Sequence, residues 1–337
     1  MTKVLAVALL AIAAFCCATA AVAPSPTTQP ATRPATQPTT QTSYQSWTFV
    51  SFSDFVHRDY LYPSAVDEEY FDNFLKIVKS SNPDFVLCAG DICDGHWGSK
   101  TNPENAIRAK ASTYFGAWRA RIAAYGLTCY NAVGDHDVGD VASQTGQLAG
   151  NFPSYHKAYA DFMGQPLNGP AHLKGTAYYV KHKNVLIVAI DPFDQDEAGK
   201  WSHDGPLSRQ MQWFEQTLAQ FKDSVDFVFV IGHFPILGSP KCHSSGIRIT
   251  GYEKSAIWNS LAKNKVDVYA SGEKHVYDHK FQDGVHHFVH GGREVCPMSY
   301  LVCTVEGKVM RIQAKSLSMA GTVQPPTLID TIVIDKR

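Results

Sequence analysis

Six short apolar runs constrain the fold of this chain more than any other feature, because five of them end in acidic or histidine-bearing turns. The runs are rich in β-branched residues and bounded by turn residues, which is typical of strands in a sheet covered on both faces. In an open α/β sheet the carboxyl ends of the strands converge on one crevice, so residues far apart in sequence can share a site. The runs are residues 48–52, 85–88, 128–133, 185–190, 227–231 and 266–270.

The five polar segments carry the side chains that a metal centre needs. Carboxylates and imidazoles gathered in one crevice are the ligands that a pair of catalytic metal ions requires. The segments are Ser53-Asp54-Phe55-Val56-His57, Gly90-Asp91-Ile92-Cys93-Asp94, Gly134-Asp135-His136-Asp137, Gly232-His233-Phe234-Pro235 and Gly272-Glu273-Lys274-His275.

Apolar stripes at helical spacing predict helices between several of these strands. After residue 292, the runs 301–305 and 309–312 predict a β-hairpin, and residues 331–334 predict a final strand. Together the elements describe an α/β domain. The stripes are Tyr70, Phe71, Phe74, Leu75 and Val78; Met211, Phe214, Leu218 and Phe221; and Ile257, Trp258 and Leu261.

The N-terminal end predicts export. Residues 1–20 combine a single charge, Lys3, with an apolar run and the small-residue triplet Ala18-Thr19-Ala20, which is typical of a cleaved signal peptide. An uncleaved anchor and a lipoprotein attached at Cys16 are the alternatives. Residues 21–45 are rich in Pro, Thr and Gln and predict a disordered linker. We therefore expect a periplasmic or secreted protein, or one tethered to the envelope through this linker.

Composition narrows the range of partners for the remaining part, residues 46–337, which contains no second linker and suits one domain. The chain has 30 basic and 31 acidic residues and no basic run, so nothing indicates a nucleic-acid partner. After signal removal, no apolar run reaches the length of a transmembrane span. Cys242 and Cys296 both lie in late loops and could form a disulfide in an exported protein, but their spacing does not establish the pairing. The oligomeric state cannot be derived from the sequence.

In their order, the five polar segments resemble the motifs of the calcineurin-like metallophosphoesterases. That family has the pattern DxH, GDxxD, GNH(D/E), a histidine after the fourth strand, and GHxH, and the resemblance spans roughly residues 46–292. It implies a two-sheet αββα sandwich in which loops at one edge carry the chemistry. It also implies a hydrolase, namely a metal-dependent phosphoric ester hydrolase with a small phosphoester as substrate.

The resemblance implies a role for each matching residue. Asp91 matches the carboxylate that bridges both metal ions, whereas Asp94 is expected to fix a loop. His136 matches the histidine that faces the scissile bond, and Asp137 would orient its imidazole. The expected metal ligands are Asp54, Asp91, Asp135, His233, Glu273 and His275.

Three positions depart from the family pattern. Asp135 replaces an asparagine and Glu273 replaces a histidine, and both keep an oxygen donor. Val56 stands at the DxH histidine position, and we expect that His57 does not fully replace that ligand, because adjacent side chains on extended backbone face opposite ways unless a bulge intervenes. The resulting four carboxylates favour Mn, Fe, Mg or Ca over Zn. Two divalent metal ions are expected, and a single ion is the alternative.

The first functional hypothesis is an exported phosphoesterase in which a metal-activated hydroxide attacks phosphorus and His136 acts as general acid. The alternative is a catalytically degenerate member that serves as a binding module of the cell envelope, because fold alone does not establish catalysis. Lys274, Arg58 and His96 are candidate substrate contacts on surface loops. No motif encodes the substrate; the expected recognition loops are residues 97–105, 144–173 and 193–207.

Overall fold

The computed structural model describes residues 45–55, 65–93, 101–139, 150–244, 246–292, 296–318 and 325–337, all of them within one compact unit. The expected signal peptide and nearly all of the expected linker lie outside the described residues. The same holds for His57, Arg58, Asp94 and His96, so the expectations for these four side chains remain predictions.

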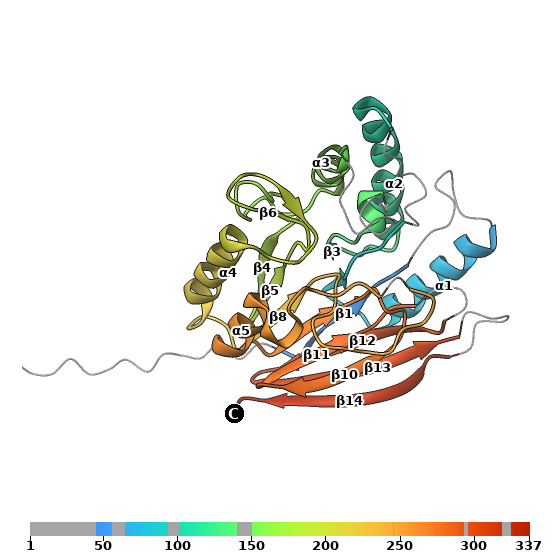
Figure 1. The fold of residues 1–337 in the computed structure, drawn as a ribbon. Coiled ribbons are helices and arrows are strands. Elements are labelled where there is room, and N and C mark those ends of the chain that lie inside the picture. Colours follow the sequence, from blue (N-terminus) through green and yellow to red (C-terminus); the bar gives the residue numbers. More distant parts are fainter. Residues whose placement is uncertain are drawn as a thin grey trace, which may run out of the picture. The chain divides into compact units, whose positions relative to one another are not determined.

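Two six-stranded sheets form the centre of the domain (Figure 1). The first contains, in spatial order, β14 (Thr327–Asp335), β13 (Val309–Leu317), β12 (Met298–Glu306), β1 (Trp47–Phe52), β2 (Phe85–Cys88) and β3 (Cys129–Asn131). The second contains β10 (Asp278–Gln282), β11 (Val285–Val289), β9 (Val268–Ser271), β8 (Phe227–Ile231), β5 (Val185–Ala189) and β4 (Tyr178–His182). Strands β1, β2 and β3 are parallel to one another, as are β5, β8, β9 and β11.

The two sheets pack face to face through an apolar layer. Successive residues of β1 alternate between its two faces, so Phe49 belongs to the inter-sheet cluster while Val50 and Phe52 belong to the cluster under the helices. The Phe49 ring meets Phe229 of the second sheet edge-on at a centroid distance of 5.2 Å. Both faces of β1 are therefore buried, which explains its nearly continuous apolar sequence.

Helices cover the outer faces of both sheets. On the first sheet, the Phe74 ring packs edge-on against Phe52 at 5.2 Å. On the second sheet, Trp258 packs against His287 of β11 at a centroid distance of 6.1 Å. The helices are α1 (Ala65–Ser80), α2 (Glu104–Ala124), α3 (Phe152–Met163), α4 (Ser208–Phe221) and α5 (Ala256–Lys263), with short 3-10 turns η1 (His136–Val138) and η2 (Tyr252–Lys254).

This arrangement confirms the predicted αββα sandwich. All six strands predicted from apolar runs are present, with ends that differ by at most two residues. Two of the segments expected to be loops contain helical residues. Residues 144–173 contain α3, and residues 97–105 contain the start of α2. The buried face of helix α3 contains several aromatic side chains, such as Tyr155 and Tyr159, and aromatic residues have low helix propensity. Residues 193–207 contain a small hairpin of β6 (Asp194–Gln195) and β7 (Trp201–Ser202).

One covalent link ties two loops of the domain together. Cys242 and Cys296 form a disulfide with a Cα–Cα distance of 6.3 Å, so the structure supplies the pairing that the sequence left open. Within the described residues, no helix is both long and apolar enough to cross a membrane.

Candidate metal centre

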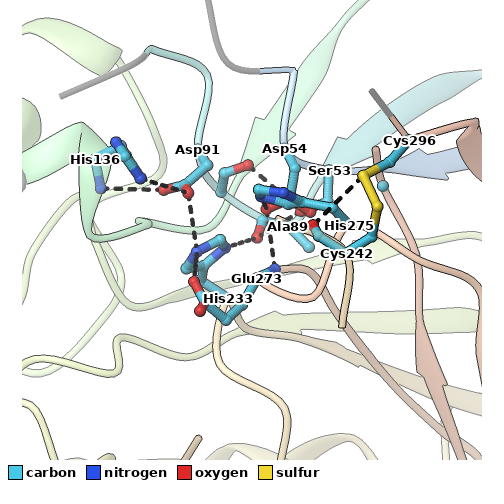
Figure 2. A network of polar contacts seen from close by, with 12 residues as sticks. Ser53, Asp54, Ala89, Asp91, His136, His233, Cys242, Glu273, His275 and Cys296 are labelled. Carbon is cyan, nitrogen blue, oxygen red and sulfur yellow. Dashed lines mark hydrogen bonds and ion pairs between the residues drawn. A yellow bond between two sulfur atoms is a disulfide. The ribbon is translucent and has the colours of Figure 1, made fainter. Parts of the chain in front are cut away.

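The six expected metal ligands lie around one centre, at the carboxyl ends of parallel strands from both sheets. Figure 2 shows all of them except Asp135. Because the two sheets face each other, loops from each can reach the same space. Asp54, Asp91 and Asp135 follow β1, β2 and β3 of the first sheet, and His233, Glu273 and His275 follow β8 and β9 of the second.

Four of these side chains form a cluster of the size that a metal ion needs. Ligand atoms of Asp91, Asp135, His233 and Glu273 all lie within 4.8 Å of one another, and the four side chains are buried. The Nε2 atom of His233 lies 3.1 Å from Asp135 Oδ1, 3.2 Å from Asp91 Oδ2 and 3.5 Å from Glu273 Oε2. Three carboxylates around one imidazole are a suitable donor set for a divalent ion.

Asp54 and His275 form a second pair beside this cluster. Asp54 Oδ1 lies 3.5 Å from His275 Nε2, and it accepts a hydrogen bond of 2.9 Å from the backbone N–H of Glu273. Figure 2 shows this pair next to Asp91 and Glu273.

The ligand loops adopt an unusual backbone conformation. Asp54, Asp91, Glu273 and His275 have φ angles of 57°, 57°, 71° and 52°, in the left-handed region. Such a conformation costs a non-glycine residue of the order of 1–3 kcal/mol and persists only where the surroundings enforce it. Its recurrence at four of the six expected ligands indicates that the fold is under constraint at this centre.

Glycines let the loops close on these carboxylates. A Cβ atom on Gly134 would lie 2.1 Å from Asp91 Oδ1, and one on Gly272 would lie 1.9 Å from Ser53 Oγ and 2.7 Å from Asp54 Oδ2. Real Cβ atoms do not approach so closely, so any larger residue would displace the carboxylate. The glycines that precede Asp135 and Glu273 therefore allow this close approach.

Hydrogen bonds with backbone groups orient two of the expected ligands, His233 and Glu273. His233 Nδ1 is 2.8 Å from the carbonyl oxygen of Ala89, which makes Nδ1 the donor and leaves Nε2 facing the carboxylates. Glu273 Oε1 accepts hydrogen bonds from the backbone N–H groups of Gly246 and Ile247, at 2.7 and 2.9 Å. This pair of donors could not be predicted from the sequence, because any residue except proline can supply a backbone N–H.

Asp137 has a different position from the one expected. We expected its carboxylate to orient the His136 imidazole. Its oxygens instead accept hydrogen bonds of 2.9 Å from the backbone N–H groups of Asp91, Ile92 and Gly134. Asp137 therefore joins the loops that carry Asp91 and Asp135, and it sets their backbone positions.

His136 lies at the edge of the cluster. Its backbone N–H donates to Asp91 Oδ1 at 3.1 Å, and its Nε2 atom is 3.9 Å from Asp91 Oδ2. Its side chain is 19% exposed, in contrast to the fully enclosed ligands. An imidazole that reaches both the cluster and solvent can exchange a proton with a substrate, the role that general acids have.

Electrostatic shifts show that the centre holds several interacting charges. Burial raises the pKa of the Asp91 carboxyl to about 7, against the opposing effect of His233. Burial also acts to raise the pKa of Asp135, but His136 and the hydrogen bond with His233 outweigh it and lower that pKa to about 2. The pKa of His233 lies well above its usual range, because the charge of Asp91 overcomes the effect of burial.

These residues fit a divalent cation. The Oδ2 atoms of Asp54, Asp91 and Asp135 are buried and have no hydrogen-bond partner among the described residues. Buried polar atoms are rarely without a hydrogen-bond partner, so we expect a bound group between these carboxylates. Protons on the imidazoles neutralise part of the negative charge here, and a cation would take their place.

Lys274, expected to be a candidate substrate contact on a surface loop, has a buried side chain. The side chain is only 3% exposed. Burial lowers its pKa to about 8, and the charges of Arg248 and Lys241 act in the same direction while Glu273 opposes them.

Comparisons with known proteins agree with this geometry. A dimetal phosphatase from Danio rerio matches with a TM-score of 0.58 and 15% identity, over 86% of this chain and 99% of that one. A purple acid phosphatase from yellow lupin (Lupinus luteus) seeds matches with a TM-score of 0.60 and 15% identity, over 86% of this chain and 54% of that one. The anchor in the inner membrane complex of Plasmodium matches with a TM-score of 0.52 and 13% identity, over 87% and 89%. At these identities the likeness shows a shared fold.

Sequence comparison gives the family. A search of curated proteins finds no match. The sequence model of the calcineurin-like phosphoesterases matches residues 49–277, which include all five polar segments and strands of both sheets. The chain belongs to the calcineurin-like phosphoesterase family.

Proposed function

We propose that this protein is an exported, metal-dependent phosphoesterase that hydrolyses a small phosphoester. One observation carries the proposal: three buried carboxylates and one buried imidazole from both sheets converge within 4.8 Å, and the Oδ2 atoms of Asp54, Asp91 and Asp135 have no hydrogen-bond partner among the described residues. Burying that many acidic groups together is unfavourable unless a cation compensates their charge. Export rests on the N-terminal sequence alone.

Two ions are proposed at this centre. Asp91, Asp135, His233 and Glu273 would hold one, and Asp54, Asp91 and His275 would hold the other. The four carboxylates offset the charge of two divalent ions, and their oxygens favour Mn²⁺, Mg²⁺, Ca²⁺ or iron over Zn²⁺. Bound ions would supply a Lewis acid for the phosphoryl oxygens and lower the pKa of attacking water.

The chain's own residues would complete the reaction. His136 is proposed to donate a proton to the departing alcohol, because its ring lies beside Asp91 and reaches solvent. Asp137 would hold the loops of Asp91 and Asp135 at a fixed spacing through its three backbone contacts. The left-handed ligand loops would keep this arrangement rigid during turnover.

Turnover of a panel of phosphoesters tests this proposal. The full chain, stripped with chelator and then supplied separately with Mn²⁺, Mg²⁺, Ca²⁺, Fe²⁺ or Zn²⁺, should hydrolyse phosphomonoesters or phosphodiesters with at least one ion and with none in chelator. Turnover that is equal with and without metal would contradict metal dependence.

The second candidate is a binding module of the cell envelope. Val56 at the DxH histidine position removes one expected ligand, and one protein of the same fold is described as an anchor. This candidate predicts that the chain folds and binds a partner without hydrolysing any phosphoester. The same panel separates the two candidates.

A further inference from the structure

Three cationic side chains lie near Glu273. Lys274 follows Glu273 directly, and Lys241 and Arg248 lie on the loop that supplies the two backbone donors to the Glu273 carboxylate. We call these three residues the basic cluster. Nothing in the family pattern of acidic and histidine residues accounts for it.

Gly246 reveals how close two of the charges are. The position that a Cβ atom on Gly246 would occupy is 3.3 Å from Lys274 Nζ and 3.4 Å from Lys241 Nζ. Two ammonium groups thus face the same point on the backbone. The N–H of this same Gly246 donates to Glu273 Oε1 at 2.7 Å, so a single residue separates the basic cluster from the candidate metal centre.

The cluster lacks a counter-charge of its own. Within the described part of the chain, no carboxylate pairs with the ammonium groups of Lys241 or Lys274, and Arg248 stacks on the Tyr252 ring at 3.9 Å. Glu273 is the acidic group next to Lys274, and its charge would be offset once a cation binds at the metal centre. A buried ammonium group without a partner is unfavourable, so an anion from outside would stabilise it.

The loop that carries the cluster is fixed in place. Its Cys242 is joined to Cys296 by the disulfide, and the Cys242 N–H donates to the Lys274 carbonyl oxygen at 2.8 Å. The Lys274 side chain is buried, whereas Lys241 is exposed. The basic cluster therefore combines a positive charge on an immobilised side chain with one that is accessible to solvent. A rigid group of cations binds an anion with less loss of conformational entropy than free lysines would.

We propose that the basic cluster is an anion subsite, and that the substrate carries a second negatively charged group, a phosphate or carboxylate, separate from the phosphoryl group at the metal centre. This inference rests on the proposed phosphoesterase function. Gly246 links the two sites, because its N–H donates to Glu273 Oε1 and both ammonium nitrogens lie within 3.4 Å of the position that a Cβ atom on it would occupy. A phosphomonoester without a second anionic group would occupy only the candidate metal centre.

Matched substrates test the subsite through selectivity. Phenyl phosphate, 3-carbamoylphenyl phosphate and 3-carboxyphenyl phosphate differ in one substituent, and propyl phosphate with propane-1,3-diyl bisphosphate tests a second phosphate. The wild type should show a kcat/KM about 10-fold to 100-fold higher for the carboxylate over the carboxamide, or for the bisphosphate over propyl phosphate, as expected for charged hydrogen bonds. The paired substitution Lys241→Gln and Arg248→Gln should reduce that ratio to near one, while Lys222→Gln, at the exposed end of α4, should leave it unchanged.

A direct binding measurement tests the anion subsite separately from catalysis. Calorimetry with phenylphosphonate and 3-carboxyphenylphosphonate, which cannot be hydrolysed as esters, should show at least 10-fold tighter binding of the carboxylated compound, and added KCl should reduce this advantage. If no phosphoester is hydrolysed but the advantage is seen, the enzyme proposal fails and the subsite stands. Hydrolysis without any preference for the second anion, or equal or absent binding of the two phosphonates, would overturn the subsite.

Discussion

Metal binding should stabilise the folded chain, and Asp91→Asn should remove most of that effect. Asp91 lies between both groups of ligands, and its Oδ2 atom is buried without a hydrogen-bond partner among the described residues. At a free metal concentration 100 times the dissociation constant, one site stabilises the native state by about 2.7 kcal/mol. For a domain of about 300 residues, an unfolding entropy of about 2.1 cal/mol/K per residue converts this to a rise of about 4 °C in Tm.

Without metal, Asp91→Asn should not destabilise the folded chain. Asparagine keeps the oxygen that accepts the His136 N–H but removes a charge that is buried among other carboxylates. Burial raises the pKa of Asp91 to about 7, so its ionised form is disfavoured in the metal-free protein. In chelator, Asp91→Asn should therefore be at least as stable as the wild type, which separates lost metal binding from misfolding.

Differential scanning calorimetry of the full chain provides the assay. The wild type and the control Asp223→Asn, at an exposed position after α4, should gain about 4 °C on addition of metal. Asp91→Asn should gain less than about 1 °C, since it loses the shared carboxylate. An equal rise in wild type and Asp91→Asn would refute the assignment of Asp91 as a ligand.

Three further predictions concern individual residues. His136→Ala should reduce kcat by about 10²–10⁴-fold while metal content, measured by mass spectrometry, stays the same; joint loss of metal would instead make it a ligand. Glu273→His should shift the preferred ion toward Zn²⁺, because imidazole replaces a hard oxygen donor, and unchanged relative affinities in competition titrations would contradict the charge reasoning. Burial lowers the pKa of His287 to about 3, and its Nε2 atom accepts the Ile236 N–H. The unfolded chain therefore takes up the proton first, and the free energy of unfolding should fall from about pH 6.5 toward pH 3 by up to about 1.4 kcal/mol per unit. In urea titrations His287→Gln should flatten this slope, and an unaltered slope would argue against it.

The positions of the site residues could be predicted from sequence because of how parallel strands end. Asp91 and His233 are 142 positions apart in the chain, yet each directly follows a short apolar run, and such runs end at a common edge. The runs also predicted strands buried on both faces, as β1 is, whereas the αββα arrangement was implied by the resemblance to the phosphoesterase motifs.

Other features of the site depend on side-chain and backbone directions that a linear pattern does not contain. Asp137 binds backbone N–H groups rather than the neighbouring imidazole, because the 3-10 turn at residues 136–138 directs its carboxylate toward the Asp91 loop. The Gly246 and Ile247 donors and the burial of Lys274 arise from a loop that packs on Glu273 through long-range contacts.

The most direct test of the central claim is a titration of phosphoester hydrolysis against bound metal, in the wild type and in Asp91→Ala. If the carboxylates of both sheets form a two-ion hydrolytic centre joined by Asp91, turnover should rise with occupancy up to two ions per chain, and Asp91→Ala should lose metal and activity together. A wild type that binds two ions and hydrolyses no phosphoester, or an Asp91→Ala variant that retains both metal and turnover, would contradict the account.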